Sequence, residues 1–367
     1  MTQQVVNEVV TETEQLLADR FGRKRAFLLG RGATGLALLY ETLTPPGGRV
    51  LLPAIACPSV LATCLLVNRT PVVVDIRENL SIDIGEVEKI ARQGDLVLAI
   101  HLYGIPCHIR ELDLICSAKG AVLVEDAAQA VGGSLDGRAL GSFGRASILS
   151  FAAGKILPAD GGGAILTDDD ELIEKLEIPV AELPARPQNI NGKARALRDE
   201  LTRVFNRARR DDPEAASEWA WLYNAFGDVY RFALEPGQAV GIPPALDDLE
   251  RNVESRREKV GWFLELLEGM NLERIEYPAD SAPFRFTFLL PRLSGSEVQD
   301  CTEEIRSAGL HASNLYLPLH WLAPERIETD GCPRADSAGV RMINLWVDDA
   351  TTRDEAVRAS RILSKWA

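Results

Sequence analysis

The sequence predicts an α/β protein with a mainly parallel central sheet flanked by helices, followed by a smaller α+β domain. Between residues 25 and 170, short runs of Val, Ile and Leu alternate with segments that have the apolar period of helices. These runs lack polar alternation, which is typical of strands buried on both faces. Strands that alternate with helices indicate a parallel sheet with right-handed crossovers. The pattern changes after residue 170, which indicates a second unit.

The predicted elements of the first unit follow one another closely. Asp83 is a suitable N-cap for one helix, and Pro58 suits the first turn of another. Two strands, at 146–151 and 163–167, flank a glycine-rich turn. The remaining strands are expected at 49–53, 71–76, 95–103 and 121–126, and the helices at 34–43, 58–68, 83–93 and 108–119.

The second half of the chain has a different character. Residues 178–195 are rich in Pro, Asn and Gly and are expected to form a mobile loop, with helices from there to residue 235. We expect a large domain over 1–240, with 178–235 as its variable segment, and a small C-terminal domain over 241–367. The small domain should contain a long helix at about 246–269, strands at 284–290 and 341–347, and a last helix at 351–366.

The composition is that of an ordinary globular protein. With 367 residues, of which 46% are hydrophobic and 26% charged, the chain can bury a large core. A net charge of −14 argues against nucleic acid and anionic membranes as partners. No apolar run is long enough to span a bilayer, and residues 1–20 lack the features of a signal peptide. Six scattered cysteines favour reduced thiols in the cytoplasm, and the four histidines have no metal-ligand spacing.

Ligands of open α/β sheets bind beyond the carboxyl ends of the strands, and polar groups occur at such positions here. The GRGATG segment (30–35) enters a helix, where backbone N–H groups and the helix dipole suit a phosphate; a plain tight turn is the alternative. In EDAAQA (125–130), Glu125 and Asp126 should face opposite sides of the sheet. A buried carboxylate needs a cation, and a protonated pyridine nitrogen is suitable; capping of the next helix is the alternative.

Lys155 ends the segment SFAAGK (150–155), which follows another strand. A lysine in a partly desolvated site has a lowered pKa and can attack an aldehyde, whereas most lysines are solvated surface groups. The GGG turn at 161–163 leaves room for the backbone beside this lysine.

These segments occur in one order together with HLYG (101–104), LYLPLHWL (315–322) and CPRADSAGVRMINLWVDD (332–349). The ordered set resembles the nucleotide-sugar aminotransferase family of the DegT/StrS type. The resemblance is close over residues 25–170 and resumes at 315. It implies the architecture of fold-type I enzymes, which use pyridoxal 5′-phosphate (PLP).

The resemblance also implies roles for individual residues around the cofactor ring. Lys155 matches the lysine that holds PLP as a Schiff base and later moves the substrate proton. Asp126 matches the carboxylate paired with the pyridine nitrogen, where a charge-assisted bond keeps the ring protonated. Gln129 matches the residue near the phenolic oxygen, and Ala128 the residue packed on one ring face. His101 is expected to be a satisfied core group near the cofactor.

For the cofactor phosphate, the resemblance implies binding by Ser150 and by the turn at Gly32 and Ala33. The family usually has Gly-Thr in this turn, and here the threonine stands one place later, at Thr34, where its hydroxyl could still approach the phosphate. The position that stacks an aromatic ring on PLP in many relatives is Cys57. Its sulfur can pack on a π face, or the thiol could act as a nucleophile.

The function implied by the resemblance is transfer of an amino group from an amino acid, typically glutamate or glutamine, to a keto-sugar, usually nucleotide-linked. His320 would contact the substrate. The resemblance also implies a homodimer with active sites at its interface and a role in polysaccharide biosynthesis. One alternative is a PLP-dependent dehydratase or lyase, or an aminotransferase acting on a non-sugar substrate. Dehydratases of the family replace the lysine with histidine, so Lys155 counts against that reaction. The other alternative is a non-catalytic regulatory protein that retains the fold.

Overall fold

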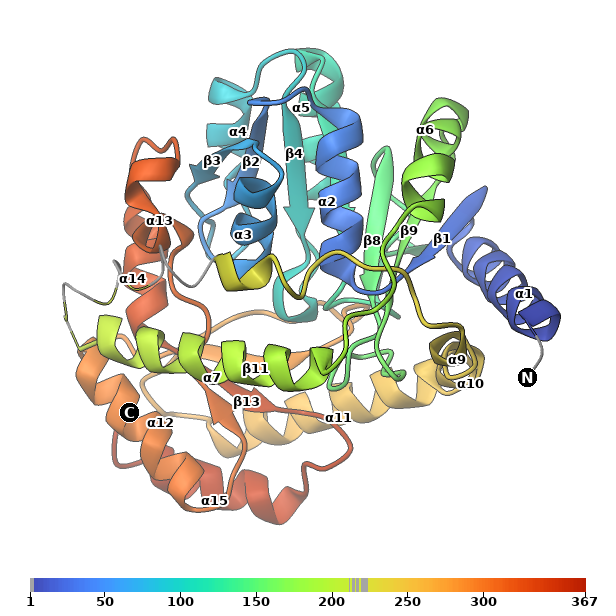
Figure 1. Cartoon of the computed structure of the whole chain (residues 1–367). Coiled ribbons are helices and arrows are strands. Elements are labelled where there is room, and N and C mark those ends of the chain that lie inside the picture. The colour runs from blue at the N-terminus through green and yellow to red at the C-terminus, as the bar shows by residue number, and fades with distance from the viewer. Residues whose placement is uncertain (1–2, 211, 213–214, 216–217, 219–223) are drawn as a thin grey trace.

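The computed structural model describes residues 3–210, 212, 215, 218 and 224–367. In this part of the chain, a large sheet with helices on both faces lies next to a second, smaller sheet (Figure 1). The prediction of a mainly parallel α/β domain followed by a small α+β unit is therefore confirmed. The predicted division at residue 240 stays a prediction.

The large sheet has seven strands in the order β1-β9-β8-β5-β4-β2-β3. Strand β9 pairs antiparallel with both of its neighbours, whereas β8, β5, β4, β2 and β3 pair in parallel. The predicted strands are all present, and β1 is an additional one. The strands are β1 (Arg25–Leu29), β2 (Arg49–Pro53), β3 (Thr70–Val74), β4 (Leu96–Ile100), β5 (Val122–Asp126), β8 (Ala146–Ser150) and β9 (Gly163–Thr167).

The helices of this domain match the predicted ones to within a few residues. Asp83 caps its helix as predicted, because its carboxylate Oδ1 accepts from the N–H groups of Gly85 at 2.8 Å and Glu86 at 3.2 Å. Pro58 is the first residue of α3, also as predicted. The helices are α1 (Gln3–Phe21), α2 (Gly32–Leu43), α3 (Pro58–Leu66), α4 (Ile84–Ile90), α5 (Ile109–Lys119) and α6 (Asp170–Ala181), with a 3₁₀ turn at Leu102–Gly104 and a small hairpin of β6 (Ser134–Leu135) and β7 (Arg138–Ala139).

The prediction of a mobile loop over 178–195 is wrong. Helix α6 continues to Ala181 and α7 (Ile190–Ala208) begins after eight intervening residues, so only 182–189 lie between the two helices. Pro179 lies within α6, and the helix ends two residues after it. In α7, burial of Ile190 and Leu197 stabilises a helix that the local Asn and Gly content disfavours.

The prediction that helices continue up to residue 235 is also wrong. Residues 231–235 are not helical, because this segment runs along the glycine-rich turn of the large domain. The N–H of Gly30 donates to the carbonyl of Phe232 at 3.0 Å. A short helix, α9 (Pro236–Ala239), follows.

The small domain contains an antiparallel sheet in the order β10-β11-β13-β12. The predicted strands and the long helix are confirmed, although a separate short helix precedes the long one. The strands are β10 (Glu273–Arg274), β11 (Arg285–Leu289), β12 (Ala312–Ser313) and β13 (Met342–Trp346). The helices are α10 (Ile242–Asp247), α11 (Leu249–Leu266), α12 (Gly295–Ser307), α13 (Leu319–Leu322), α14 (Pro333–Arg341) and α15 (Arg353–Leu363), with a 3₁₀ turn at Pro324–Arg326.

Helix α11 joins the two hydrophobic cores. Leu249 and Val253, in its first half, pack into the core of the large domain. Val260 and Phe263, in its second half, pack into the core of the small domain. In Figure 1 this helix lies below the large sheet, and β4 points its carboxyl end toward the small domain. The carboxyl ends of the parallel strands are therefore covered by residues of the small domain.

Candidate active site

The ends of two neighbouring strands bring together the residues predicted to hold a cofactor. Strand β5 ends at Asp126 and its parallel neighbour β8 ends at Ser150. Lys155 lies in the loop that connects β8 to β9, and Ser150 is paired with Gly163 at the base of this loop. Cys57, at the start of α3, is close enough to Lys155 for their charges to interact.

Lys155 is half-buried, and its surroundings favour the neutral amine. Burial lowers the pKa of Lys155, and the positive charge of Arg285 acts in the same direction. Cys57 and Asp126 oppose this lowering. The Nζ atom lies 5.1 Å from the centroid of the Phe284 ring, which belongs to the small domain. A lysine with a lowered pKa can act as a nucleophile and can accept and return a proton near neutral pH.

Asp126 is buried, and one hydrogen bond reaches its carboxylate within the described residues: the N–H of Ala128 donates to Oδ1 at 2.9 Å. Burial raises the pKa of Asp126, whereas the hydrogen bond from Ala128 and the charge of Lys155 lower it. A buried carboxylate with so few donors calls for a further cationic donor. The protonated pyridine nitrogen of PLP has this chemistry, so the site fits the cofactor. Packing of Ala128 on its ring stays a prediction.

Glu125 has a different role from its neighbour, as the alternation of side chains predicted. Its carboxylate accepts from His101 Nε2 at 2.8 Å and from the N–H groups of Gly141 at 2.6 Å and Phe143 at 2.7 Å. The N–H of Cys107 donates to His101 Nδ1 at 3.0 Å, so the ring proton is on Nε2 and is donated to Glu125. His101 is a satisfied core group, and Glu125 anchors the end of β5.

The glycine-rich turn at the start of α2 lies directly against the end of β8. A Cβ atom on Gly32 would come within 3.4 Å of Ser150 Cβ, and one on Gly163 would come within 2.4 Å of the Gly32 nitrogen. Position 163 therefore requires glycine if the backbones are to approach this closely, whereas a Cβ at position 32 would make only tight contacts. Ala33 follows Gly32 in the first turn of α2, and Ser150 lies against Gly32. This arrangement of a helix N-terminus and a hydroxyl suits the phosphate group of PLP.

Thr34 does not contribute to this phosphate site in the way the sequence suggested. Its side chain is completely buried, and its hydroxyl donates to the carbonyl of Tyr230 at 2.6 Å. The proton that could bind a phosphate is therefore used to hold Tyr230, which directly precedes the 231–235 segment, against the turn. Gln129 is buried as well, and its Oε1 accepts from the N–H of Tyr103 at 3.1 Å, which leaves its amide N–H groups for another acceptor.

Cys57 and His320 lie on different elements, Cys57 at the start of α3 and His320 in α13. The thiol of Cys57 is partly exposed, accepts from Ser59 Oγ at 3.1 Å and interacts with Lys155. It is thus in the site, and its packing on the cofactor stays a prediction. His320 lies in α13, where its Nε2 is 2.8 Å from Asp336 Oδ1, an oxygen that also accepts from Trp321 Nε1 at 2.7 Å. Substrate contact by His320 stays a prediction.

An aromatic and cationic wall from the small domain was missed by sequence reasoning. Arg285 is the first residue of β11 and Phe284 directly precedes it, and both interact with Lys155. Tyr316 stacks on Tyr103, with ring centroids 6.1 Å apart. The signal that could have identified this wall is the charge of Arg285 within the otherwise apolar segment 284–290.

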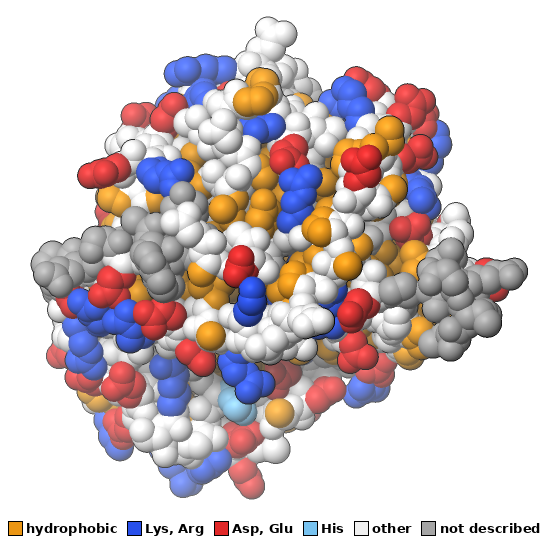
Figure 2. Space-filling view, viewed as in Figure 1, with side chains coloured by type: hydrophobic (Ala, Val, Ile, Leu, Met, Phe, Trp, Pro, Cys, Tyr) orange, Lys and Arg blue, Asp and Glu red, His pale blue; other side chains and the backbone are white. Residues whose placement is uncertain are grey.

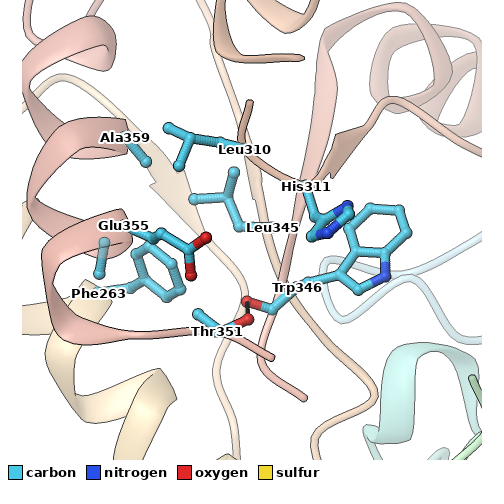
Figure 3. A pocket seen from close by; sticks show the side chains of 9 residues that line it. Phe263, Leu310, His311, Leu345, Trp346, Thr351, Glu355 and Ala359 are labelled. Carbon is cyan, nitrogen blue, oxygen red and sulfur yellow. Dashed lines mark hydrogen bonds between the residues drawn. The ribbon is translucent and has the colours of Figure 1, made fainter. Parts of the chain in front are cut away.

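A small pocket lies within the small domain, and its lining includes none of the residues predicted to bind the cofactor. It holds a volume of about 20 Å³, enough for a single water molecule, and lies between β13 and α15 (Figure 3). Its lining includes Leu310, His311, Trp346 and Glu355. No group of His, Cys, Asp or Glu among the described residues is arranged to hold a metal ion. None of the helices searched there is both long and apolar enough to cross a membrane.

The chain is similar to known proteins along most of its length. Relatives include GDP-perosamine synthase from Caulobacter vibrioides, 24% identical over 93% of this chain and 85% of that protein. Another is UDP-N-acetyl-3-dehydro-alpha-D-glucosamine 3-aminotransferase from Acidithiobacillus ferrooxidans, 25% identical over 91% of this chain and 82% of that protein.

The fold is also that of solved structures. GDP-4-keto-6-deoxy-D-mannose-3-dehydratase from E. coli, with bound hydrated PLP, superposes with a TM-score of 0.73 at 19% identity, over 97% of this chain and 91% of that one. The model of the DegT/DnrJ/EryC1/StrS aminotransferase family matches residues 4–363, nearly the whole chain. The chain therefore belongs to the DegT/DnrJ/EryC1/StrS aminotransferase family of PLP-dependent enzymes.

Proposed function

We propose that this protein transfers the amino group of an amino acid, glutamate or glutamine, to the ketone of a nucleotide-linked sugar. The observation that carries the proposal is the pairing of a half-buried Lys155, whose pKa is lowered, with the buried carboxylate of Asp126. A proton carrier and an anion for a pyridinium nitrogen are the two groups that PLP-dependent amino transfer requires of a protein.

Each residue has a definite task in this proposal. PLP, when bound, supplies the electron sink that makes a proton on the substrate carbon acidic. Lys155 takes that proton on its Nζ and returns it, in the donor half-reaction and again in the acceptor half-reaction. Asp126 would bind the pyridine nitrogen, and Ser150 with the N–H groups at Gly32 and Ala33 would bind the phosphate. Gln129 would donate from its amide to the phenolic oxygen.

The proposed acceptor follows from the relatives. GDP-perosamine synthase and the UDP-linked 3-aminotransferase are both named for sugars that carry a nucleotide. The retained Lys155 favours amino transfer over dehydration, because dehydratases of this family have histidine at that position. A non-catalytic binding protein would have no need of both Lys155 and Asp126.

The test is spectroscopic. Purified protein with added PLP should show the visible absorbance of protein-bound cofactor, which glutamate or glutamine should bleach and a nucleotide-linked keto-sugar should restore. Borohydride treatment followed by peptide mass spectrometry should locate the cofactor on Lys155. If Lys155→Ala still fixes the cofactor on borohydride treatment, the assignment of the lysine is wrong. Bleaching without recovery in the presence of a keto-sugar would favour a lyase.

We further propose a cytoplasmic homodimer with a role in polysaccharide biosynthesis. All six cysteines are free, which suits a reducing compartment. Figure 2 shows hydrophobic side chains gathered in the middle of the face that carries α2, α3 and α7, and a patch of this kind is typical of an interaction surface. Light scattering after gel filtration tests the dimer, and a monomeric enzyme with full activity would refute an active site shared between subunits.

A further inference from the structure

Within the described part of the chain, Arg285 is a buried cation without an ion-pair partner, and it lies close to Lys155. It is the first residue of β11, and its side chain is almost completely buried. The hydrogen bond found for it runs from Nη1 to the carbonyl of Phe284 at 2.7 Å, and no ion pair among the described residues includes it. A buried guanidinium in this situation is stabilised when an anion binds, because its desolvation is otherwise uncompensated.

The position of the guanidinium is fixed by aromatic rings. Its Cζ atom lies 4.0 Å from the ring centroid of Phe284 and 4.0 Å from that of Trp346, which is its cross-strand neighbour on β13. The Trp346 ring is itself in contact with His311, at a centroid distance of 6.0 Å, and Figure 3 shows these two rings side by side. Such cation–π contacts hold the side chain in place without neutralising its charge.

Arg285 remains positively charged in this position. Burial lowers the pKa of Arg285 to about 10, helped by the charge of Arg256, and the charge of Asp348 only partly offsets this. Near neutral pH the guanidinium is thus protonated and presents donors that fit the two oxygens of a carboxylate.

The place of this charge relative to Lys155 identifies its ligand. The amine Nζ of Lys155 and the guanidinium of Arg285 both lie against the ring of Phe284. An α-amino acid carries its amine and its carboxylate on the same carbon atom, so it can place one group at Lys155 and the other at Arg285. In a nucleotide-linked sugar the phosphates are separated from the ketone by atoms of the sugar ring.

We propose that Arg285 binds the α-carboxylate of the amino donor, and that this contact selects α-amino acids over simple amines. The inference rests on the proposed amino transfer. Arg285 is then a substrate-binding residue of the donor half-reaction. Arg285 is not expected to bind the keto-sugar in the acceptor half-reaction, although both substrates use the same site.

The experiment separates the two half-reactions in the holoenzyme. The rate of bleaching by L-glutamate and by L-glutamine is measured against concentration for the wild type, Arg285→Gln and Arg285→Lys. We expect the donor concentration for half-maximal rate to rise at least about tenfold in Arg285→Gln, the scale of losing a hydrogen bond to a charged group. Arg285→Lys should show a smaller loss. Recovery of the aminated enzyme with a keto-sugar should stay within about twofold of wild type.

Two controls keep the outcome interpretable. Arg353→Gln removes an arginine that also lies over a tryptophan, at 5.9 Å from Trp262, but on the surface and paired with Glu265; it should behave as wild type. Bleaching by n-butylamine, which has no carboxylate, should be equally slow with or without Arg285. Calorimetric binding of unreactive glutarate should weaken in parallel with the donor, which gives a measurement independent of turnover.

The results that overturn the inference are specific. Unchanged donor saturation in a folded, cofactor-loaded Arg285→Gln protein would exclude the carboxylate contact while leaving the proposed function intact. A loss confined to the keto-sugar step would assign Arg285 to the phosphates of the acceptor instead. A loss for glutamate but not for glutamine would assign it to the side-chain carboxylate. A wild-type holoenzyme that no amino acid bleaches would refute the proposed function itself.

Discussion

Replacing Glu125 by glutamine should destabilise the protein, although the substitution changes a single oxygen to NH₂. The Glu125 carboxylate accepts two hydrogen bonds on Oε1, from His101 and Gly141, and one on Oε2, from Phe143. All of these groups are donors. In either orientation of the amide, the NH₂ group of a glutamine must face at least one backbone N–H and cannot accept from it.

The magnitude follows from these contacts. One buried donor loses its partner, and the other bonds lose the assistance of a full negative charge, so the free energy of unfolding should fall by about 3 kcal/mol. Glu125 is completely buried, and water therefore cannot replace the missing acceptor. Because Glu125 anchors the end of β5, we expect the neighbouring Asp126 to be held less firmly.

Urea unfolding of the cofactor-free protein, followed by far-ultraviolet circular dichroism, measures this loss as a shift of the midpoint at unchanged slope. Asp126→Asn is the matched control, because it makes the same chemical change one residue along the strand, at a carboxylate with one bonded donor. A loss below about 1 kcal/mol for Glu125→Gln, or an equal loss for both variants, would refute the assignment of an anchoring role to Glu125 alone.

Three further predictions concern the cofactor site. Burial raises the pKa of Asp126 in the folded protein, so the cofactor-free protein should lose stability as the pH rises from about 4 through that raised pKa. In urea titrations, Asp126→Asn should lack this part of the pH dependence of stability. The same variant should bind PLP more weakly than the wild type. Gly163→Ala should raise the dissociation constant of PLP more than about tenfold and lower the free energy of unfolding by about 2–3 kcal/mol, because the alanine Cβ would collide with backbone atoms of Gly32 and Leu149. A dissociation constant equal to that of the wild type would contradict the close approach of these backbones. Thr34→Val should lower the free energy of unfolding by about 1 kcal/mol and change the affinity for PLP by less than about twofold, because the Thr34 hydroxyl donates to a backbone carbonyl. A large loss of PLP affinity would show instead that Thr34 binds the phosphate.

The parts of the site that the sequence predicted are those set by local motifs and by strand order. Asp126 and Ser150 follow apolar strands, and parallel strands place their carboxyl ends on one edge, so their proximity follows from the fold class. Lys155 is five residues beyond Ser150 and cannot lie far away. These residues needed no long-range contact to be recognised.

The parts that were missed depend on partners distant in the sequence. Thr34 appeared free to bind a phosphate, but its acceptor, the carbonyl of Tyr230, is 196 residues away. Arg285 stands within a strand that otherwise reads as core, and its proximity to Lys155 arises from the packing of the small domain. The loop prediction for 178–195 was wrong for the same reason, because burial of Ile190 outweighs a local composition typical of loops.

The position of β9 has a consequence for the timing of assembly during synthesis. Within the described residues, β1 is hydrogen-bonded in the sheet to β9 alone, and β9 ends at Thr167. The N-terminal strand must therefore wait for well over a hundred residues to leave the ribosome before it can dock. The turn at Gly32 is fixed against Gly163 in the same event. A nascent chain that is still shorter than this lacks the finished turn proposed to bind the cofactor phosphate, so we expect the proposed site to form late in folding.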